Sequence, residues 1–165
     1  MKIGNVYILD KTEQQIVELV ANQRQNNKVN TGWDGKGTVN EKSGVDLNIV
    51  GFGAEFIFCR ELNLYPDFKI HNTSKSNGTD YYDAVYKSKT IDVKVNRNHK
   101  HPLMIPSYAK SECDLFALFS CIYPRYRFEG FATNEMVFNK SNIRMTRVES
   151  FVIEKTDLLE IDKVF

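Results

Sequence analysis

The segment 90–96, which reads TIDVKVN, alternates strictly between polar and apolar side chains. A period of two is typical of a β-strand that buries one face and exposes the other. Because residues two positions apart project from the same face of a strand, the Asp92 carboxylate and the Lys94 ammonium point to the same side. The pattern therefore predicts a half-buried strand that presents a carboxylate and a lysine at one place.

A second short run, 83–86 (DAVY), lies just upstream and is followed by a polar turn around 87–89. The two runs are predicted to pair as a β-hairpin. Pairing brings Asp83 close to Asp92 at one edge of the sheet. Carboxylate oxygens are ligands that Mg²⁺ prefers, so the hairpin predicts a site for a hard cation beside a lysine.

The register of this hairpin decides whether its two carboxylates can cooperate. In an antiparallel hairpin, the residue numbers of each facing pair have the same sum. Asp83 faces Asp92 only if this sum is 175, and Lys87-Ser88 is then the turn. A register shifted by one residue, which pairs Asp83 with Val93, sends the two carboxylates to opposite faces. Lys-Ser lacks the Gly or Asn that two-residue turns favour. A wider turn with an even number of residues, or a bulge, is the alternative, and Asp80 is the competing carboxylate.

The segment 46–63 is predicted to form a helix that begins at Asp46 as its cap and ends before Pro66. Its core-facing stripe is Val50, Ala54, Ile57 and Phe58. Glu55 lies among small and aromatic residues, where a carboxylate is costly to bury without a partner. Either it approaches the sheet, which Gly51 and Gly53 would permit, or it is a solvated residue on the outer face.

An earlier helix is predicted over Thr12–Asn26, after a short strand at Val6–Leu9. Thr12 and Gln15 form a capping-box pattern, and Ile16, Leu19 and Val20 form the apolar stripe. The segment 27–44 is rich in Asn, Gly and Lys and is predicted to be a flexible loop. It is either a plain surface loop or a flap in which Arg24, Lys28, Lys36 and Trp33 contact nucleic acid.

These motifs together resemble the PD-(D/E)XK nuclease superfamily, in particular its small phage-type members. The resemblance consists of Asp83, eight intervening residues, Asp92-Val93-Lys94, and Gly53-Ala54-Glu55 on the preceding helix. A literal Pro66-Asp67 follows that helix directly and is interpreted as a decoy. The resemblance implies an α/β fold with a restriction-endonuclease-like mixed β-sheet flanked by helices, within one domain that spans residues 1–165.

The resemblance also implies a metal-dependent nuclease, with DNA as the expected substrate and endonucleolytic cleavage. Asp83, Asp92 and Glu55 would bind Mg²⁺, or Mn²⁺ as its substitute, with help from a backbone carbonyl near Val93. With Lys94 they would be the catalytic residues. Nearby carboxylates raise the pKa of a lysine, which favours orientation and charge stabilisation by Lys94 over proton abstraction. The alternatives are a catalytically silent module that binds nucleic acid or protein, and a dimeric Holliday-junction resolvase.

The segment 93–111 contains several basic residues and no acidic one. Arg97, Lys100 and Lys110 are the predicted contacts to nucleic-acid phosphates; a solvated loop is the alternative. Beyond it, the apolar run 113–122 predicts a central strand covered on both faces. A strand at 128–132 and a short helix capped by Thr133 follow.

Composition limits the remaining possibilities. The formal net charge of +1 means that attraction to nucleic acid must come from local clusters. Three cysteines without a CxxC pair argue against structural zinc and against a disulfide framework, and they favour a reducing compartment. No apolar run is long enough to span a membrane. We therefore expect a cytoplasmic protein with no membrane partner. A homodimer is the protein partner considered.

Overall fold

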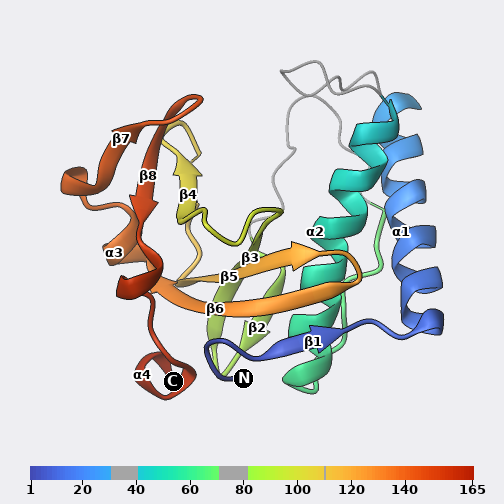
Figure 1. Ribbon diagram of the computed structural model, residues 1–165, viewed down its shortest axis with the longest axis horizontal. Coiled ribbons are helices and arrows are strands. Elements are labelled where there is room, and N and C mark those ends of the chain that lie inside the picture. Colours follow the sequence, from blue (N-terminus) through green and yellow to red (C-terminus); the bar gives the residue numbers. More distant parts are fainter. Residues whose placement is uncertain (31–40, 71–81, 110) are drawn as a thin grey trace.

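A computed structural model describes residues 1–30, 41–70, 82–109 and 111–165. Its centre is a curled five-stranded mixed sheet in the order β1-β6-β5-β3-β2, joined by several helices into an α/β arrangement (Figure 1). The strands of this sheet are β1 (Val6–Ile8), β2 (Ala84–Tyr86), β3 (Lys89–Asn96), β5 (Leu115–Ile122) and β6 (Arg125–Thr133). β3 runs parallel to β5, and the other pairs are antiparallel.

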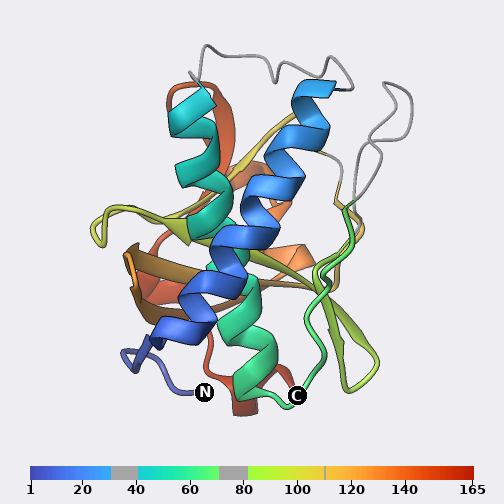
Figure 2. The same ribbon diagram turned by 90° about the vertical axis from the view of Figure 1, so that its right-hand side faces the viewer.

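Two long helices, α1 (Lys11–Asn30) and α2 (Glu41–Glu61), lie side by side at one end of the molecule (Figure 2). Both are longer than predicted, so 27–30 and 41–44 are helical and not part of a loop; residues 31–40, with Trp33 and Lys36, lie outside the described residues. Asp46 is inside α2 and does not cap it.

The start of α1 is set by a different capping box from the predicted one. The Asp10 carboxylate accepts a hydrogen bond from the Glu13 backbone N–H (2.9 Å), and the Glu13 carboxylate accepts one from the Asp10 N–H (2.8 Å). This reciprocal pair satisfies two of the donors that a helix start leaves without partners. The predicted pair, Thr12 and Gln15, lies two residues too late.

The buried stripe of α1 also differs from the predicted one. Val17, Val20 and Ala21 are buried, whereas Ile16 and Leu19 remain 36% and 63% exposed. The inner face follows i, i+3, i+4 and i+7 from Val17, and its i+7 member is Arg24. Because a charged residue interrupts the true stripe, the apolar pattern alone indicated a face rotated toward Ile16.

The predicted stripe of α2 is confirmed, since Val50, Ala54, Ile57 and Phe58 are all buried. Gly53 explains how closely this helix approaches the sheet: a Cβ atom there would lie 2.1 Å from the Tyr126 hydroxyl oxygen. Nothing lies within 4 Å of a Cβ built at Gly51, so the predicted close approach requires only one of the two glycines.

β5 is the central strand, and its residues are buried except for Ile122, as the apolar run predicted. The helix capped by Thr133 is also confirmed: in α3 (Asn134–Val137) the Thr133 hydroxyl accepts a hydrogen bond from the Met136 N–H. β6 is longer than its predicted 128–132 and begins at Arg125.

A second sheet was not predicted. It has the order β4-β8-β7, from Leu103–Pro106, Glu149–Ile153 and Ile143–Met145. Leu103, Ile105 and Ile153 pack with Phe116 and Leu118 of β5, so this sheet covers the face opposite α2. The remaining short elements are η1 (Lys140–Asn142), η2 (Lys155–Asp157) and α4 (Ile161–Val164).

The register of the β2–β3 hairpin is confirmed. Tyr86 pairs with Lys89 and Ala84 with Ile91, so paired numbers sum to 175 and Lys87-Ser88 is the turn. Both turn residues adopt positive φ, at 47° and 64°, although neither is Gly or Asn. The hairpin is anchored beyond its turn, because the Thr90 N–H and hydroxyl both donate to the Asp114 carboxylate at the start of β5.

Candidate functional site

Asp83 directly precedes Ala84, the first residue of β2 that pairs with β3. Both its backbone and its side chain form hydrogen bonds to β3. Its backbone N–H donates to the Ile91 carbonyl (2.9 Å), and its carboxylate accepts a hydrogen bond from the Val93 N–H (2.6 Å). The side chain thus occupies the position that a neighbouring strand's carbonyl would take. Asp83 is held against the edge of β3, beside Asp92, by two hydrogen bonds.

Asp92 and Lys94 lie on the face of β3 opposite to Ile91 and Val93, as the alternation predicted. Ile91 and Val93 are buried in the core with α2, whereas Asp92 and Lys94 are 17% and 41% exposed. The Lys94 ammonium is 2.6 Å from the Asp92 carboxylate. The hairpin therefore carries two carboxylates and one lysine within a few residues of each other.

Glu55 approaches this hairpin from α2 and is not a solvated residue on the outer face. Its side chain is 19% exposed and accepts a hydrogen bond from the Arg24 guanidinium at 3.1 Å. The charges of Asp92 and Lys94 both act on the pKa of Glu55, so the helix and the hairpin are close enough to interact. Glu55, Asp83, Asp92 and Lys94 therefore lie near enough to one another for their charges to interact.

The carboxylates repel one another electrostatically. Burial raises the pKa of Asp83 well above its usual value, and the charges of Glu55 and Asp92 raise it further. Burial likewise raises the pKa of Glu55, although Arg24 opposes this shift. A cation placed among these groups would relieve both the burial cost and the mutual repulsion.

Lys94 is held in its charged form. Burial lowers its pKa, but the nearby Asp92 and Asp83 carboxylates together outweigh that effect and leave the pKa above its ordinary value. The direction is the one expected from the sequence. Lys94 is therefore an ammonium at neutral pH and stabilises negative charge.

The donors of the site suit a hard cation in chemistry, although they are not gathered around one point. Among the residues that the structure describes, no three His, Cys, Asp or Glu side chains form a group that could hold a metal ion as they stand. Two buried thiols lie near the carboxylates, and burial raises the pKa of Cys59 to about 12 and that of Cys113 as well. Protonated thiols are poor ligands, which leaves carboxylate oxygens as the donors.

Two of the three predicted nucleic-acid contacts, Arg97 and Lys100, lie beyond the end of β3. Arg97 and Lys100 are exposed in the segment after β3, and Arg97 follows Asp92 by five residues, a span of about 16 Å along a strand. Arg97 lines a hollow of about 450 Å³ together with the acidic residues Glu18 and Asp46. Lys110 and Asp80 lie outside the described residues.

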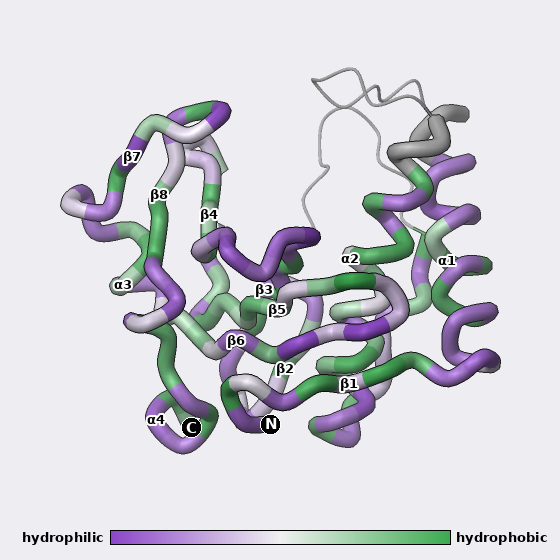
Figure 3. Tube along the Cα trace, in the orientation of Figure 1, coloured by the Kyte–Doolittle hydropathy of each residue, from purple (hydrophilic) through white to green (hydrophobic). Residues whose placement is uncertain are grey.

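The segment 97–102 is fixed in place, and Figure 3 shows hydrophilic residues along it. The Asn96 amide donates to the carbonyls of His101 and Pro102, and the Lys155 ammonium donates to the carbonyl of His99. It therefore presents its basic side chains from a defined backbone.

Sequence reasoning missed two charged groups. Arg24, considered earlier only as a contact of a flap, is directed inward, and its position as the i+7 member of the α1 stripe was the signal that could have identified it. The other group is Glu129, only 5% exposed, which accepts a hydrogen bond from the Ser120 hydroxyl and pairs with Lys155 at 2.8 Å. Glu129 is the extra, unpaired residue at the register shift between β5 and β6. No local sequence pattern predicts this irregularity.

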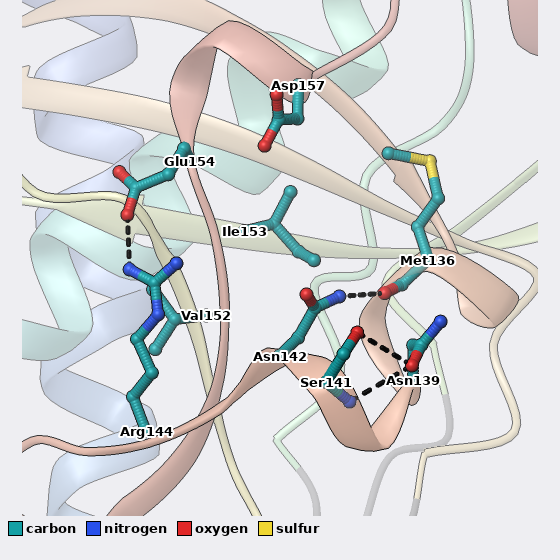
Figure 4. Close-up of a pocket in the computed structure, with 9 residues that line it drawn as sticks. All are labelled: Met136, Asn139, Ser141, Asn142, Arg144, Val152, Ile153, Glu154 and Asp157. Atoms are coloured by element: carbon teal, nitrogen blue, oxygen red, sulfur yellow. Dashed lines mark hydrogen bonds and ion pairs between the residues drawn. The ribbon is translucent and has the colours of Figure 1, made fainter.

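A separate polar pocket of about 240 Å³ lies in the region of the second sheet (Figure 4). It is lined by residues of α3, η1, β7 and β8 and contains the Arg144–Glu154 ion pair. The four residues of the candidate site, Glu55, Asp83, Asp92 and Lys94, do not line this pocket.

Pro66-Asp67, interpreted as a decoy, contributes a backbone carbonyl that accepts a hydrogen bond from Arg24. Within the described part of the chain, no helix combines the length and apolar character needed to cross a membrane. In comparisons with protein-family models, curated proteins and solved structures, the chain matched none of them.

Proposed function

We propose that this protein is a metal-dependent nuclease that hydrolyses phosphodiester bonds, with DNA as the first substrate to test. The observation that carries the proposal is the β2–β3 hairpin that holds Asp83 beside the Asp92–Lys94 pair, with Glu55 of α2 near enough for its charge to act on Asp83. The hairpin has the register on which a shared site depends. A buried carboxylate whose pKa is raised by burial and by neighbouring carboxylates, beside a charged lysine, is more typical of a functional site than of a stable core.

Asp83, Asp92 and Glu55 are the residues that would hold Mg²⁺ or Mn²⁺. A bound ion of this kind activates a water molecule and neutralises charge on the phosphate. Asp83 is oriented by the Val93 N–H, and Glu55 by Arg24, so each keeps a defined position. Lys94 contributes a fixed positive charge where negative charge develops on the phosphate oxygens.

The test is a cleavage assay with labelled single-stranded, duplex and branched DNA, together with RNA, in Mg²⁺, in Mn²⁺ and with a chelator. Cleavage that requires the metal and is lost in Asp92→Asn supports the proposal, because the substitution removes a ligand charge at nearly constant volume. Asp162→Asn, at an exposed position in α4, is the matched control. Undiminished cleavage by Asp92→Asn would end the assignment.

One observation favours a silent binding module: the described carboxylates do not form a ready group for a metal, and Asp92 is already paired with Lys94. Such a module would bind nucleic acid or a protein without cutting. Binding of DNA in Mg²⁺ with no product on any substrate of the panel would support it. Cleavage of the branched substrate alone would instead indicate a junction resolvase, whose dimeric state sedimentation would test.

A further inference from the structure

Arg24 of α1 is held from three sides next to the candidate site. One terminal nitrogen donates to a Glu55 oxygen (3.1 Å), the other donates to the Asp67 carbonyl (2.7 Å), and the guanidinium carbon lies 4.6 Å from the centre of the Phe52 ring. These contacts connect α1, α2 and the chain that follows α2. With its side chain 20% exposed, Arg24 has little freedom to turn toward solvent.

The contacts of Arg24 favour a role in orienting Glu55. Its third nitrogen, Nε, is buried and has no hydrogen-bond partner among the described residues. A guanidinium that served only to stabilise the fold would be expected to satisfy its buried donors. Only one oxygen of Glu55 receives a hydrogen bond from the described chain, which leaves the other available to a ligand.

Arg24 also changes the charge of the site. Glu55, Asp83 and Asp92 contribute three carboxylates, and Arg24 and Lys94 contribute two cations, so the formal charge is −1. Without Arg24 it would be −2. A site of charge −1 attracts a divalent cation more weakly than a site of charge −2. The phosphate of a bound substrate would supply the further negative charge.

We propose that Arg24 is a positioning residue that orients Glu55 and at the same time lowers the charge of the site, so that metal binds tightly only together with a phosphodiester. This inference rests on the proposed nuclease function and deepens it. Metal and substrate then bind cooperatively, and the free protein carries little metal. The two effects of Arg24 are separable, because a lysine keeps the charge but lacks the planar fork that fixes the carboxylate.

The test measures Mn²⁺ affinity by calorimetry at about pH 8, well above the ordinary pKa of a carboxyl group, and the cleavage rate separately. Arg24→Gln removes the charge and is expected to tighten Mn²⁺ binding to the free protein on the order of tenfold, while the cleavage rate falls. Arg24→Lys is expected to leave Mn²⁺ affinity unchanged and still lower the rate. A DNA analogue with non-hydrolysable linkages should tighten Mn²⁺ binding more in the unmodified protein than in Arg24→Gln.

Arg60 provides the matched control. It also links the two helices, since it lies near the end of α2 and pairs with Glu13 of α1 at 2.8 Å. Arg60→Gln removes an interhelical ion pair of the same kind away from the carboxylates of the site. It is expected to change neither Mn²⁺ affinity nor the cleavage rate of the folded protein.

The outcomes separate this inference from the proposed function. Looser Mn²⁺ binding together with a slower rate in Arg24→Gln would mean a structural role and would overturn the inference, as would unchanged affinity. If Arg24→Gln does not fold, Arg24→Lys decides: a lower rate at unchanged affinity supports the inference, and a parallel loss of both overturns it. If the unmodified protein cleaves nothing and yet Arg24→Gln binds Mn²⁺ more tightly, the nuclease proposal fails and the effect of Arg24 on the charge of the site stands.

Discussion

The candidate site and the group around Glu129 both combine carboxylates of low exposure with basic side chains, and they differ in how charge is balanced. Glu129 is a single carboxylate that pairs with Lys155 at 2.8 Å and with the more exposed Arg127 at 4.0 Å, and it accepts a hydrogen bond from Ser120. The candidate site instead combines three carboxylates with Arg24 and Lys94, and the charges of Glu55 and Asp92 raise the pKa of Asp83 beyond the effect of its burial. A balanced group stabilises the fold, whereas an excess of like charge is tolerated where a ligand is to bind.

The same contrast appears in what each group connects. Lys155 joins Glu129 of the central sheet to the carbonyl of His99, so this group attaches the segment after β3 to η2 and the second sheet. Lys94 contacts Asp92, its neighbour on the same strand, and connects no distant segments through the described contacts. We therefore expect substitutions of these two lysines to separate function from stability.

The largest expected effect is on catalysis. Lys94→Ala should lower the cleavage rate by about 10²–10³-fold, the usual cost of removing one group that stabilises developing charge. The thermal midpoint should change little, because Lys94 is 41% exposed and its partner is a neighbouring side chain. Lys155→Ala is the matched substitution: it should lower the thermal midpoint while the folded fraction retains its rate. If Lys94→Ala unfolds the protein instead, Lys94 is a structural residue and the contrast fails.

The next largest effect concerns stability. Glu129→Gln should lower the free energy of unfolding by about 3 kcal/mol, the typical cost of breaking a buried ion pair by neutralising one partner. Its neighbour Lys155 would lose its counterion, and the Ser120 hydroxyl would lose a charged acceptor. Urea denaturation monitored by circular dichroism measures the change. A loss below about 1 kcal/mol, as in exposed pairs, would contradict the assignment of this group to the fold.

Asp83→Asn should have a smaller effect of the opposite sign. The amide oxygen can still accept the Val93 N–H, and the repulsion from Glu55 and Asp92 disappears. We expect the thermal midpoint at neutral pH to rise by roughly 2–4 °C, equivalent to about 1 kcal/mol for a chain of this size. A clear drop would show that the Asp83 charge stabilises the fold.

The pH dependence gives the same prediction a second measurement. The pKa of Asp83 is raised in the folded protein, so between the unfolded and folded pKa values the folded form binds more protons. The contribution of Asp83 to stability is therefore greatest below its unfolded pKa, and it decreases as the pH rises from the unfolded to the folded pKa. Glu55 acts in the same direction. Asp83→Asn should flatten the fall, and Mg²⁺ should reduce it in the unmodified protein; an equal slope in both proteins would contradict this account.

The sequence indicated the hairpin well because its information is local. An alternation over seven residues places Asp92 and Lys94 on one face of the strand. A shared site also requires a hairpin register that keeps Asp83 beside them, and the observed register does so. The second sheet could not be predicted in this way. β4 has four residues inside a basic segment, and it pairs with β8, whose residues lie far along the chain. Its strand character depends on that distant partner.

The partners of the site residues were also hidden from local patterns. Arg24 interrupts an apolar stripe, and a charged residue at such a position is usually assigned to the surface. Its burial follows from Glu55, Phe52 and the Asp67 carbonyl, which lie on other segments. The residue types of a site can therefore be predicted from spacing, whereas the groups that orient them emerge only when segments distant in sequence come together.

The smallest expected effect concerns the exposed basic segment after β3. If Arg97 and Lys100 contact phosphates, substitution of either by Gln should lower the slope of log affinity against log salt by about one unit. The two residues are not equivalent, because Arg97 shares a hollow with Glu18 and Asp46, which repel phosphate, so Lys100→Gln should have the larger effect. Fluorescence anisotropy with labelled DNA at several salt concentrations measures both slopes, and exposed Lys163 of α4 is the control position. Equal slopes in all variants would mean that DNA approaches the carboxylates from another side, and that the fixed segment 97–102 serves the fold alone.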